Sequence, residues 1–159
     1  MTAKKAATPK AAAKQAAQAP QAAPDLEALA RAAQARAYAP YSKFHVGCAL
    51  RTRDGTVFTG ANVENASYGL CICAERNALM AMALAGHRDL AELVVATDIA
   101  PPASPCGMCR QTMLEFSPDP AATRITAVGP GTARVSWTVA ELIPAGFTGK
   151  QLAPTKRRR

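Results

Sequence analysis

The sequence reads Asn65-Ala-Ser-Tyr-Gly-Leu-Cys-Ile-Cys-Ala-Glu-Arg76 in one segment and Ser104-Pro-Cys-Gly-Met-Cys-Arg-Gln111 in another. In these segments Cys73, Cys106 and Cys109 have the spacing of three zinc ligands, and Glu75 follows the first ligand by two positions. Three thiolates leave one corner of a tetrahedral Zn²⁺ open to water, which is typical of a catalytic rather than a structural site. Because a carboxylate beside that corner can carry protons, the two segments predict a catalytic zinc site.

The local structure around the cysteines is expected to favour thiolates. Cys73 and Cys106 are each predicted to begin a helix, where unpaired backbone N–H groups and the positive end of the helix dipole stabilise a negative charge. Cys109 follows Cys106 by three residues, so its sulfur should lie on the same face one turn further on. Three thiolates give the zinc site a net negative charge, and Arg76 and Arg110, each next to a ligand segment, are expected to offset it.

Two other interpretations of the cysteines remain open. The second Cys-x-x-Cys pair by itself is compatible with a redox pair. With Cys71 included, four thiolates could close a structural zinc site that has no open corner. That arrangement would leave Glu75 without a role, and Cys71 and Cys73 are too close in sequence to reach one tetrahedron easily.

The overall composition indicates one domain with polar ends. The chain of 159 residues is long enough for a single domain with a core. Its formal charge of +8 comes from residues 1–14 and 156–159, which hold four basic residues each, while the 11 other basic residues balance 11 acidic ones. We therefore predict a disordered tail rich in Ala, Lys and Pro at residues 1–24, a domain at residues 25–153 and a basic tail at residues 154–159.

The expected location is the cytoplasm, without a membrane. The sequence has no run of about 18 apolar residues and no apolar core of a secretory signal. Its five cysteines are odd in number and partly in close pairs, which favours metal binding in a reducing compartment over disulfides.

Hydrophobic periodicity predicts alternating helices and strands after the first tail. In chain order we expect a helix from Asp25 to before Pro40, strands at 44–51 and 56–61 joined by an Asp54-Gly55 turn, a helix at 73–85, a strand at 90–97, a helix at 106–116 started by Ser104-Pro105, strands at 124–128 and 133–137, and a short helix at 139–142. This order predicts an α/β sandwich of about five strands.

Five motifs are spread over the domain in a fixed order. They are Tyr41-Ser-Lys-Phe-His-Val-Gly47, Asn62-Val-Glu-Asn65, Cys73-Ala-Glu-Arg76, Pro105-Cys-Gly-Met-Cys-Arg110 and Leu142-Ile-Pro-Ala-Gly-Phe147. Together they resemble the homotetrameric cytidine deaminases over residues 25 to about 155, and Cys-x-Glu followed by Pro-Cys-x-x-Cys is the three-cysteine form of the zinc deaminase signature. The resemblance implies a three-layer α/β/α sandwich with a mixed five-stranded sheet.

The resemblance also implies an activity. It is the hydrolytic deamination of cytidine and deoxycytidine to uridine and deoxyuridine, with release of ammonia, in cytoplasmic pyrimidine salvage. Cys73, Cys106 and Cys109 are implied to hold one Zn²⁺ per subunit. Glu75 is implied to carry protons from the water to the ring nitrogen and the leaving amino group.

Substrate-binding residues are implied in the same way: Phe44, Asn62, Glu64, Ala74, Tyr68 and Phe147. Phe44 would pack against the pyrimidine, and Asn62 and Glu64 would hold the ribose 3′-hydroxyl, because an amide and a carboxylate together offer a donor and an acceptor. Tyr68 and Phe147 would reach the site of a neighbouring subunit in a homotetramer. As an alternative, Asn62 and Glu64 could simply cap the turn after the hairpin.

Two rival functions are also compatible with the sequence. One is the deamination of another aminopyrimidine nucleoside, such as a blasticidin-type antibiotic. The other is a non-catalytic zinc module that binds nucleic acid through its basic tails, which predicts salt-sensitive binding and no ammonia release.

Overall fold

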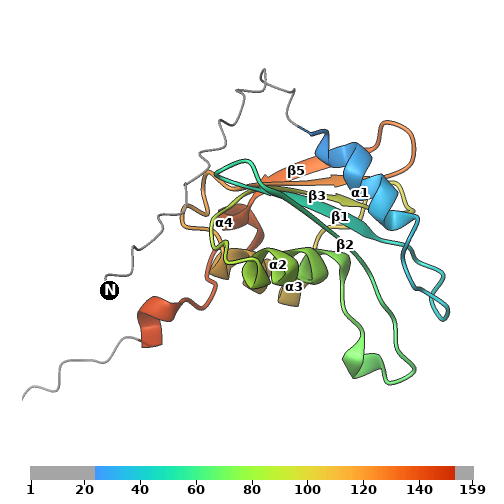
Figure 1. Cartoon of the computed structure of the whole chain (residues 1–159), viewed down its shortest axis with the longest axis horizontal. Helices are drawn as coiled ribbons and strands as arrows, with labels where there is room; N and C mark the ends of the chain where they lie inside the picture. The colour runs from blue at the N-terminus through green and yellow to red at the C-terminus, as the bar shows by residue number, and fades with distance from the viewer. Residues whose placement is uncertain (1–23, 153–159) are drawn as a thin grey trace, which may run out of the picture.

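The structure, a computed structural model, describes residues 24–152 (Figure 1). Residues 1–23 and 153–159 lie outside the described residues, and with them nearly all of the two expected tails. Within residues 24–152, no helix is long and apolar enough to cross a membrane.

Five strands form one mixed sheet in the order β2-β1-β3-β4-β5. The strands are β1 (Gly47–Thr52), β2 (Val57–Ala61), β3 (Leu90–Ala96), β4 (Arg124–Val128) and β5 (Arg134–Thr138). All neighbouring strands are antiparallel except β3 and β4, which are parallel. Parallel strands need a crossover connection, and the segment that crosses from β3 to β4 carries two of the three proposed zinc ligands.

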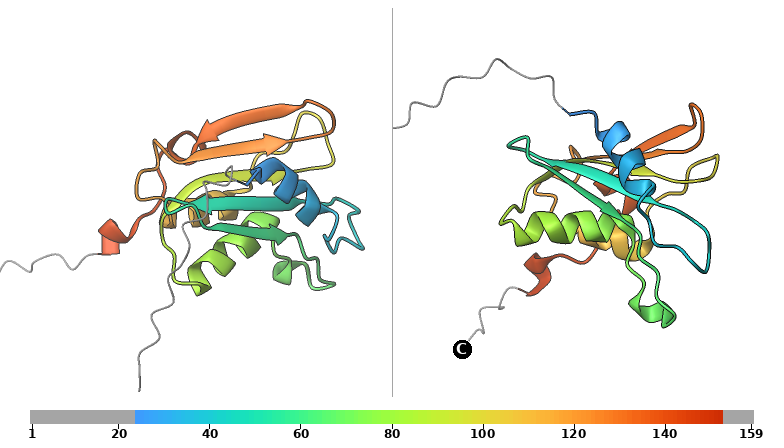
Figure 2. Two further views of the ribbon diagram at one scale, coloured as in Figure 1. Left: turned by 45° about the horizontal axis from the view of Figure 1, so that its top comes forward. Right: turned by 45° about the vertical axis from the view of Figure 1, so that its right-hand side comes forward.

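Helices cover both faces of the sheet and confirm the three-layer α/β/α sandwich (Figure 2). One face carries α1 (Leu26–Gln34), and the other carries α2 (Ala74–Leu84), α3 (Gly107–Glu115) and α4 (Val139–Leu142). Two short 3₁₀ helices, η1 (Tyr68–Leu70) and η2 (Gly149–Leu152), project from the body of the domain (Figure 1).

The first helix begins as expected and ends early. The Asp25 side chain accepts a hydrogen bond from the Glu27 N–H at 2.9 Å and caps α1. The helix was expected to continue toward Pro40, but it ends at Gln34. The reason is that Tyr38 pairs with the segment after β2, because its N–H donates to the Asn62 carbonyl at 2.9 Å.

Two other expected boundaries are wrong. The strand expected from Phe44 begins only at Gly47, because the backbone of residues 44–46 is bonded mainly to side chains rather than to a second strand. Ser104 does not start α3, since Cys106 is the residue that precedes its first turn. The Ser104 hydroxyl instead accepts a hydrogen bond from Arg110 at 2.9 Å.

The main core lies between the sheet and α2, α3 and α4. Its largest buried side chains include Leu50, Leu79, Met82, Leu93, Met113 and Ile125. A smaller core joins α1 to the other face through Leu26, Ala30, Ala49, Ala96 and Val128. Cys48 is fully buried in β1, as expected for a small hydrophobic residue.

Two glycines allow the helices to lie directly on the sheet. A Cβ atom on Gly47 of β1 would overlap backbone atoms of Ala30 and Gln34 in α1. A Cβ atom on Gly60 of β2 would lie 2.5 Å from the Ala74 carbonyl oxygen at the start of α2. The absence of a side chain at Gly60 therefore allows the start of α2 to pack closely against the β1–β2 hairpin.

Candidate active site

Three sulfur atoms meet at the starts of two helices. Cys73 precedes the first turn of α2, and Cys106 precedes the first turn of α3. The Cys73 and Cys106 Sγ atoms are 3.9 Å apart, and the Cys106 and Cys109 Sγ atoms are 3.5 Å apart. All three lie within 4.8 Å of one another. Tetrahedral ligands with Zn–S bonds of about 2.3 Å have sulfur–sulfur distances of about 3.8 Å, so the cluster fits a zinc ion.

Cys71 does not belong to this cluster. Its Sγ atom accepts a hydrogen bond from the Asn65 N–H at 3.3 Å and donates to the Asn65 carbonyl at 3.6 Å. The only group of three potential metal ligands found among residues 24–152 is the trio of Cys73, Cys106 and Cys109. The four-cysteine alternative is therefore not supported, and no fourth protein ligand joins the three sulfurs in the part of the chain that the structure describes.

The environment of the three sulfurs shifts the pKa of Cys73 and that of Cys109 in opposite directions. The hydrogen bond from Cys109 and the neighbouring guanidinium of Arg76 lower the pKa of Cys73 to about 5. The same hydrogen bond with Cys73, followed by burial, raises the pKa of Cys109 well above its ordinary value. The negative charge of the cluster is therefore favoured on Cys73 rather than on the more buried Cys109.

The two arginines beside the ligands have different partners. Arg76 donates from Nη2 to the Cys71 carbonyl at 3.0 Å and lies 3.8 Å from the Cys73 Sγ atom. Arg110 donates to the Pro105 carbonyl at 2.7 Å, to the Ser104 hydroxyl at 2.9 Å and to the Leu142 carbonyl at 3.2 Å. Arg110 thus contacts the segment that leads into α3 and the last residue of α4, whereas Arg76 is hydrogen-bonded to the sulfur of Cys73.

Glu75 is buried beside the ligands. It is the second residue of α2 and is only 5% exposed. Burial raises the pKa of its carboxyl group above the ordinary value. A raised pKa lets a carboxyl group hold a proton more readily than an exposed one, as a proton carrier must.

A cavity of about 200 Å³ lies over the cluster. Phe44, Asn62, Ala74 and Glu75 line it together with Cys73 and Cys106, so three of the six expected substrate-binding residues are brought to the metal site. The other lining residues, for which the sequence predicted no role in the cavity, are Val46, Val95, Thr97, Ala103 and Ser104. Thr97 follows the carboxyl end of β3, next to the parallel strand β4, which is a common position for ligand sites in α/β sheets.

Asn62 and Glu64 both bind the loop before β1. The Asn62 side chain accepts from the Val46 N–H at 2.8 Å and donates to the Phe44 carbonyl at 2.9 Å. Glu64 accepts from the N–H groups of Tyr41 and Ser42 at 2.9 and 3.2 Å and from the Ser42 hydroxyl, and the hydroxyl contact lowers its pKa. Glu64 lines a second cavity with Tyr41, Ser42, Tyr68 and Cys71 rather than the one over the sulfurs.

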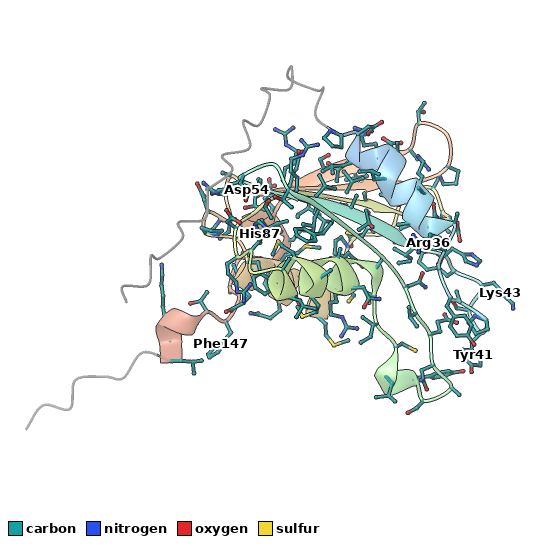
Figure 3. The ribbon with its side chains drawn as sticks, viewed as in Figure 1. Arg36, Tyr41, Lys43, Asp54, His87 and Phe147 are labelled. Carbon is teal, nitrogen blue, oxygen red and sulfur yellow. The ribbon has the colours of Figure 1, made fainter. Side chains whose placement is uncertain are left out.

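Tyr68 and Phe147 lie outside the cavity of their own chain. Tyr68 is 76% exposed, and its ring contacts that of Tyr41 edge to face with centroids 6.2 Å apart. Phe147 is 55% exposed and lies at the opposite end of the molecule from Tyr41 (Figure 3). Neither ring contributes to the cavity over the sulfurs within one chain.

Comparisons with known proteins agree with this geometry. A family model described as the cytidine and deoxycytidylate deaminase zinc-binding region matches residues 21–122. The chain is 45% identical over 126 residues to a cytidine deaminase of Halalkalibacterium halodurans, which covers 78% of this chain and 94% of that protein. It is 39% identical over 128 residues to a cytidine deaminase of Sporosarcina psychrophila, covering 80% and 93% of the two chains. The crystal structure of cytidine deaminase from Burkholderia pseudomallei superposes with a TM-score of 0.71 at 44% identity, covering 76% of this chain and 98% of that one.

Proposed function

This chain belongs to the cytidine deaminase family and is a zinc-dependent enzyme that deaminates cytidine, and we propose that Cys73, Cys106 and Cys109 hold the zinc while Glu75 carries the protons. The reaction adds water at C4 of the pyrimidine, breaks the bond to the exocyclic nitrogen and releases ammonia. The observation that carries this assignment is the trio of sulfurs at tetrahedral spacing beside a buried carboxyl group in one cavity.

The proposed chemistry depends on the placement of Glu75. When bound, Zn²⁺ supplies the Lewis acidity that makes a water molecule nucleophilic near neutral pH. Glu75 would accept the first proton that this water loses and pass it to the ring nitrogen N3. It would then take the proton of the new C4 hydroxyl and give it to the amino group, so that the C4–N bond breaks, the C4 carbonyl forms and ammonia leaves. Because the carboxyl group is buried and has a raised pKa, it is suited to hold the proton between these steps.

The substrate is proposed to lie along the cavity with its sugar toward the loop before β1. Phe44 packs against the pyrimidine ring, and Ala74, the first residue of α2, offers a backbone N–H that has no partner within the helix. Asn62 uses one lone pair and one N–H for the loop, so a second of each remains for the 3′-hydroxyl. The neighbouring Glu64 supplies a further acceptor. This arrangement accepts deoxycytidine as well as cytidine, since no residue is assigned to the 2′-hydroxyl.

A homotetramer is proposed to complete each site. In it, Tyr68 and Phe147 enter the sites of neighbouring subunits, and their high exposure in the single chain supports that role. The outer faces of α2 and α3 also expose large apolar side chains, of which Leu84 is 91% exposed and Met108 is 61% exposed. Covering such side chains with another subunit removes apolar surface from water.

The enzyme is proposed to act in pyrimidine salvage in the cytoplasm. All five cysteines are free in the structure, which suits a reducing compartment. The domain that carries this activity is proposed to span residues 25–153, with tails on either side.

Steady-state kinetics of the purified protein test these assignments. Cytidine and deoxycytidine should both be converted with release of one ammonia per turnover, and chelation should abolish conversion until Zn²⁺ is restored. Turnover of cytidine but not of deoxycytidine would contradict the proposed sugar contacts. Fast turnover of another aminopyrimidine nucleoside, with little of either substrate, would contradict the proposed specificity.

A further inference from the structure

The segment that carries Phe44 into the cavity belongs to no helix or strand. The Phe44 N–H donates to the Ser42 hydroxyl at 3.0 Å, and the Phe44 carbonyl accepts from the Asn62 side chain at 2.9 Å. The Val46 N–H donates to the same Asn62 side chain at 2.8 Å, and the Val46 carbonyl accepts from the Asn62 N–H at 3.1 Å. The backbone N–H and carbonyl groups of Phe44 and Val46 are therefore hydrogen-bonded to Ser42 and Asn62.

The peptide groups of His45 are held from a different side of the molecule. Its N–H donates to Oδ2 of Asp98 at 2.7 Å, and its carbonyl accepts from Nε2 of Gln34 at 3.0 Å. Gln34 Nε2 also donates to Oδ1 of Asp98 at 2.8 Å, and the His45 Nδ1 atom lies 3.2 Å from Oδ2. Asp98, in the segment after β3, and Gln34, the last residue of α1, thus bind the two peptide groups of His45 and each other. We call this pair of residues the bracket.

This bracket joins two walls of the cavity. Asp98 follows Thr97, and His45 follows Phe44; Thr97 and Phe44 both line the cavity. Phe44 and Thr97 are 53 positions apart in the chain, as are His45 and Asp98, and the bracket extends the contact between their segments beyond the last β1–β3 pair, Gly47 and Ala96. The His45–Asp98 ion pair itself contributes little, because both side chains are more than 40% exposed at 43% and 42%. What matters is the short, directional bond to the peptide N–H, which an ionised acceptor strengthens.

We propose that Asp98 is a positioning residue for the nucleoside, because it fixes the His45 peptide and thereby holds the Phe44 ring against the base. Asp98 does not touch the substrate. The proposal rests on the proposed function, in which the Phe44 ring packs on the pyrimidine. The Phe44 ring contacts the base equally in the bound substrate and in the transition state. Loss of this contact therefore weakens substrate binding more than it slows the chemical step.

The test is the steady-state kinetics of Asp98→Ala with cytidine. Loss of a hydrogen bond to an ionised group should raise KM about ten-fold, while kcat stays within about two-fold of wild type. Asp98→Asn keeps an oxygen acceptor for the His45 N–H, so its KM should stay within about three-fold of wild type. Zinc content should be the same in all three proteins.

A matched control is available at the other end of the sheet. Asp54 also accepts from a backbone N–H, that of Thr56 at 3.0 Å, and also lies near a histidine, with 3.3 Å to His87 Nδ1. The Asp54–His87 pair lies far from Lys43, the neighbour of Phe44 (Figure 3). Asp54→Ala should therefore lower Tm by an amount similar to that in Asp98→Ala without changing KM.

A double-mutant cycle separates positioning of Phe44 from a general structural effect. If Asp98 acts through the ring, Asp98→Ala should change KM less than about two-fold in a Phe44→Ala background. An undiminished ten-fold effect in that background would overturn the proposal. So would an unchanged KM in a folded Asp98→Ala protein, or a fall in kcat alone.

If Asp98→Ala does not fold, Gln34→Ala replaces it, because this change removes the other side-chain bond to the His45 peptide. Its KM should rise several-fold, and a KM within two-fold of wild type would contradict the bracket. Turnover of cytidine by the wild-type protein tests the proposed function separately. Only the comparison among the variants tests the role of Asp98.

Discussion

The Nη2 atom of Arg76 lies 3.8 Å from the Sγ atom of Cys73 and 3.0 Å from the carbonyl oxygen of Cys71. One guanidinium thus fixes the backbone before the first zinc ligand and places a positive charge against its sulfur. The hydrogen bond to Cys73 raises the pKa of Arg76, and the same contact helps to lower the pKa of Cys73. Three thiolates exceed the charge of a divalent cation, so this contact lowers the electrostatic cost of the site.

Arg76→Gln tests the contribution of that charge. Glutamine keeps a donor but loses the positive charge, so we expect zinc affinity to fall about 10- to 100-fold and kcat to fall as well. Competition with a chelator of known affinity measures the first effect. Arg36→Gln removes the same charge from an exposed position (Figure 3) and should change neither quantity. Equal zinc affinity in the two variants would contradict the proposed role of Arg76.

Glu75→Gln tests the proton carrier. The amide has nearly the shape of the carboxyl group and suits the buried position, but it cannot accept and return a proton. We expect kcat to fall about 10²- to 10⁴-fold while the variant keeps one zinc per chain. Metal analysis beside steady-state kinetics distinguishes the two roles, because loss of zinc from the variant would mean that Glu75 is needed to build the site.

The two helices of the zinc cluster and the Cys106–Cys109 pair were predictable from the sequence because they depend on short-range order. Cys106 and Cys109 are one turn apart on one helix, and their Sγ distance of 3.5 Å follows from helix geometry. The convergence of Cys73 on the same point follows from a sandwich in which both helices cover one face of the sheet. Phe44, Asn62 and Ala74, which also line the cavity, were predicted from the resemblance to a known family.

The contacts that could not be predicted from the sequence join segments that are far apart in the chain. Val95 reaches the cavity because β3 pairs with β1, where it lies opposite Cys48. No local pattern specifies that register. For the same reason the contact of Arg110 with the Leu142 carbonyl could not be predicted, because Leu142 lies in α4, 32 positions further along the chain.

Cys71→Ala tests the number of zinc ligands. The Cys71 sulfur is bonded to the Asn65 backbone, so its removal should leave zinc affinity and kcat/KM within about two-fold of wild type. Cys73→Ala is the comparison and should lose the metal. If instead both variants lost zinc to a similar degree, Cys71 would have to be a fourth ligand and no corner would remain for water.

Removal of residues 1–23 tests the proposed domain boundary. The residues that line the cavity begin at Phe44, and the matched relative from Halalkalibacterium halodurans has 94% of its length in the 126 aligned residues. A chain that starts at Pro24 keeps the Asp25 cap of α1 and should retain kcat/KM within about two-fold of wild type. A ten-fold fall would place part of the active enzyme in the removed segment.

Gly47→Ala tests the contact between α1 and β1. A methyl group at this position would overlap the Ala30 carbonyl and the Gln34 N–H, and rigid backbone atoms cannot move aside as a side chain can. We expect the free energy of unfolding to fall by about 2–3 kcal/mol, or Tm by roughly 5–10 °C. Gly149→Ala is the control, because a Cβ atom there meets no other atom within 4 Å. The displaced Gln34 also binds the His45 carbonyl, so Gly47→Ala should raise KM for cytidine as well as lower stability. A loss of stability with an unchanged KM would mean that α1 does not help to position Phe44.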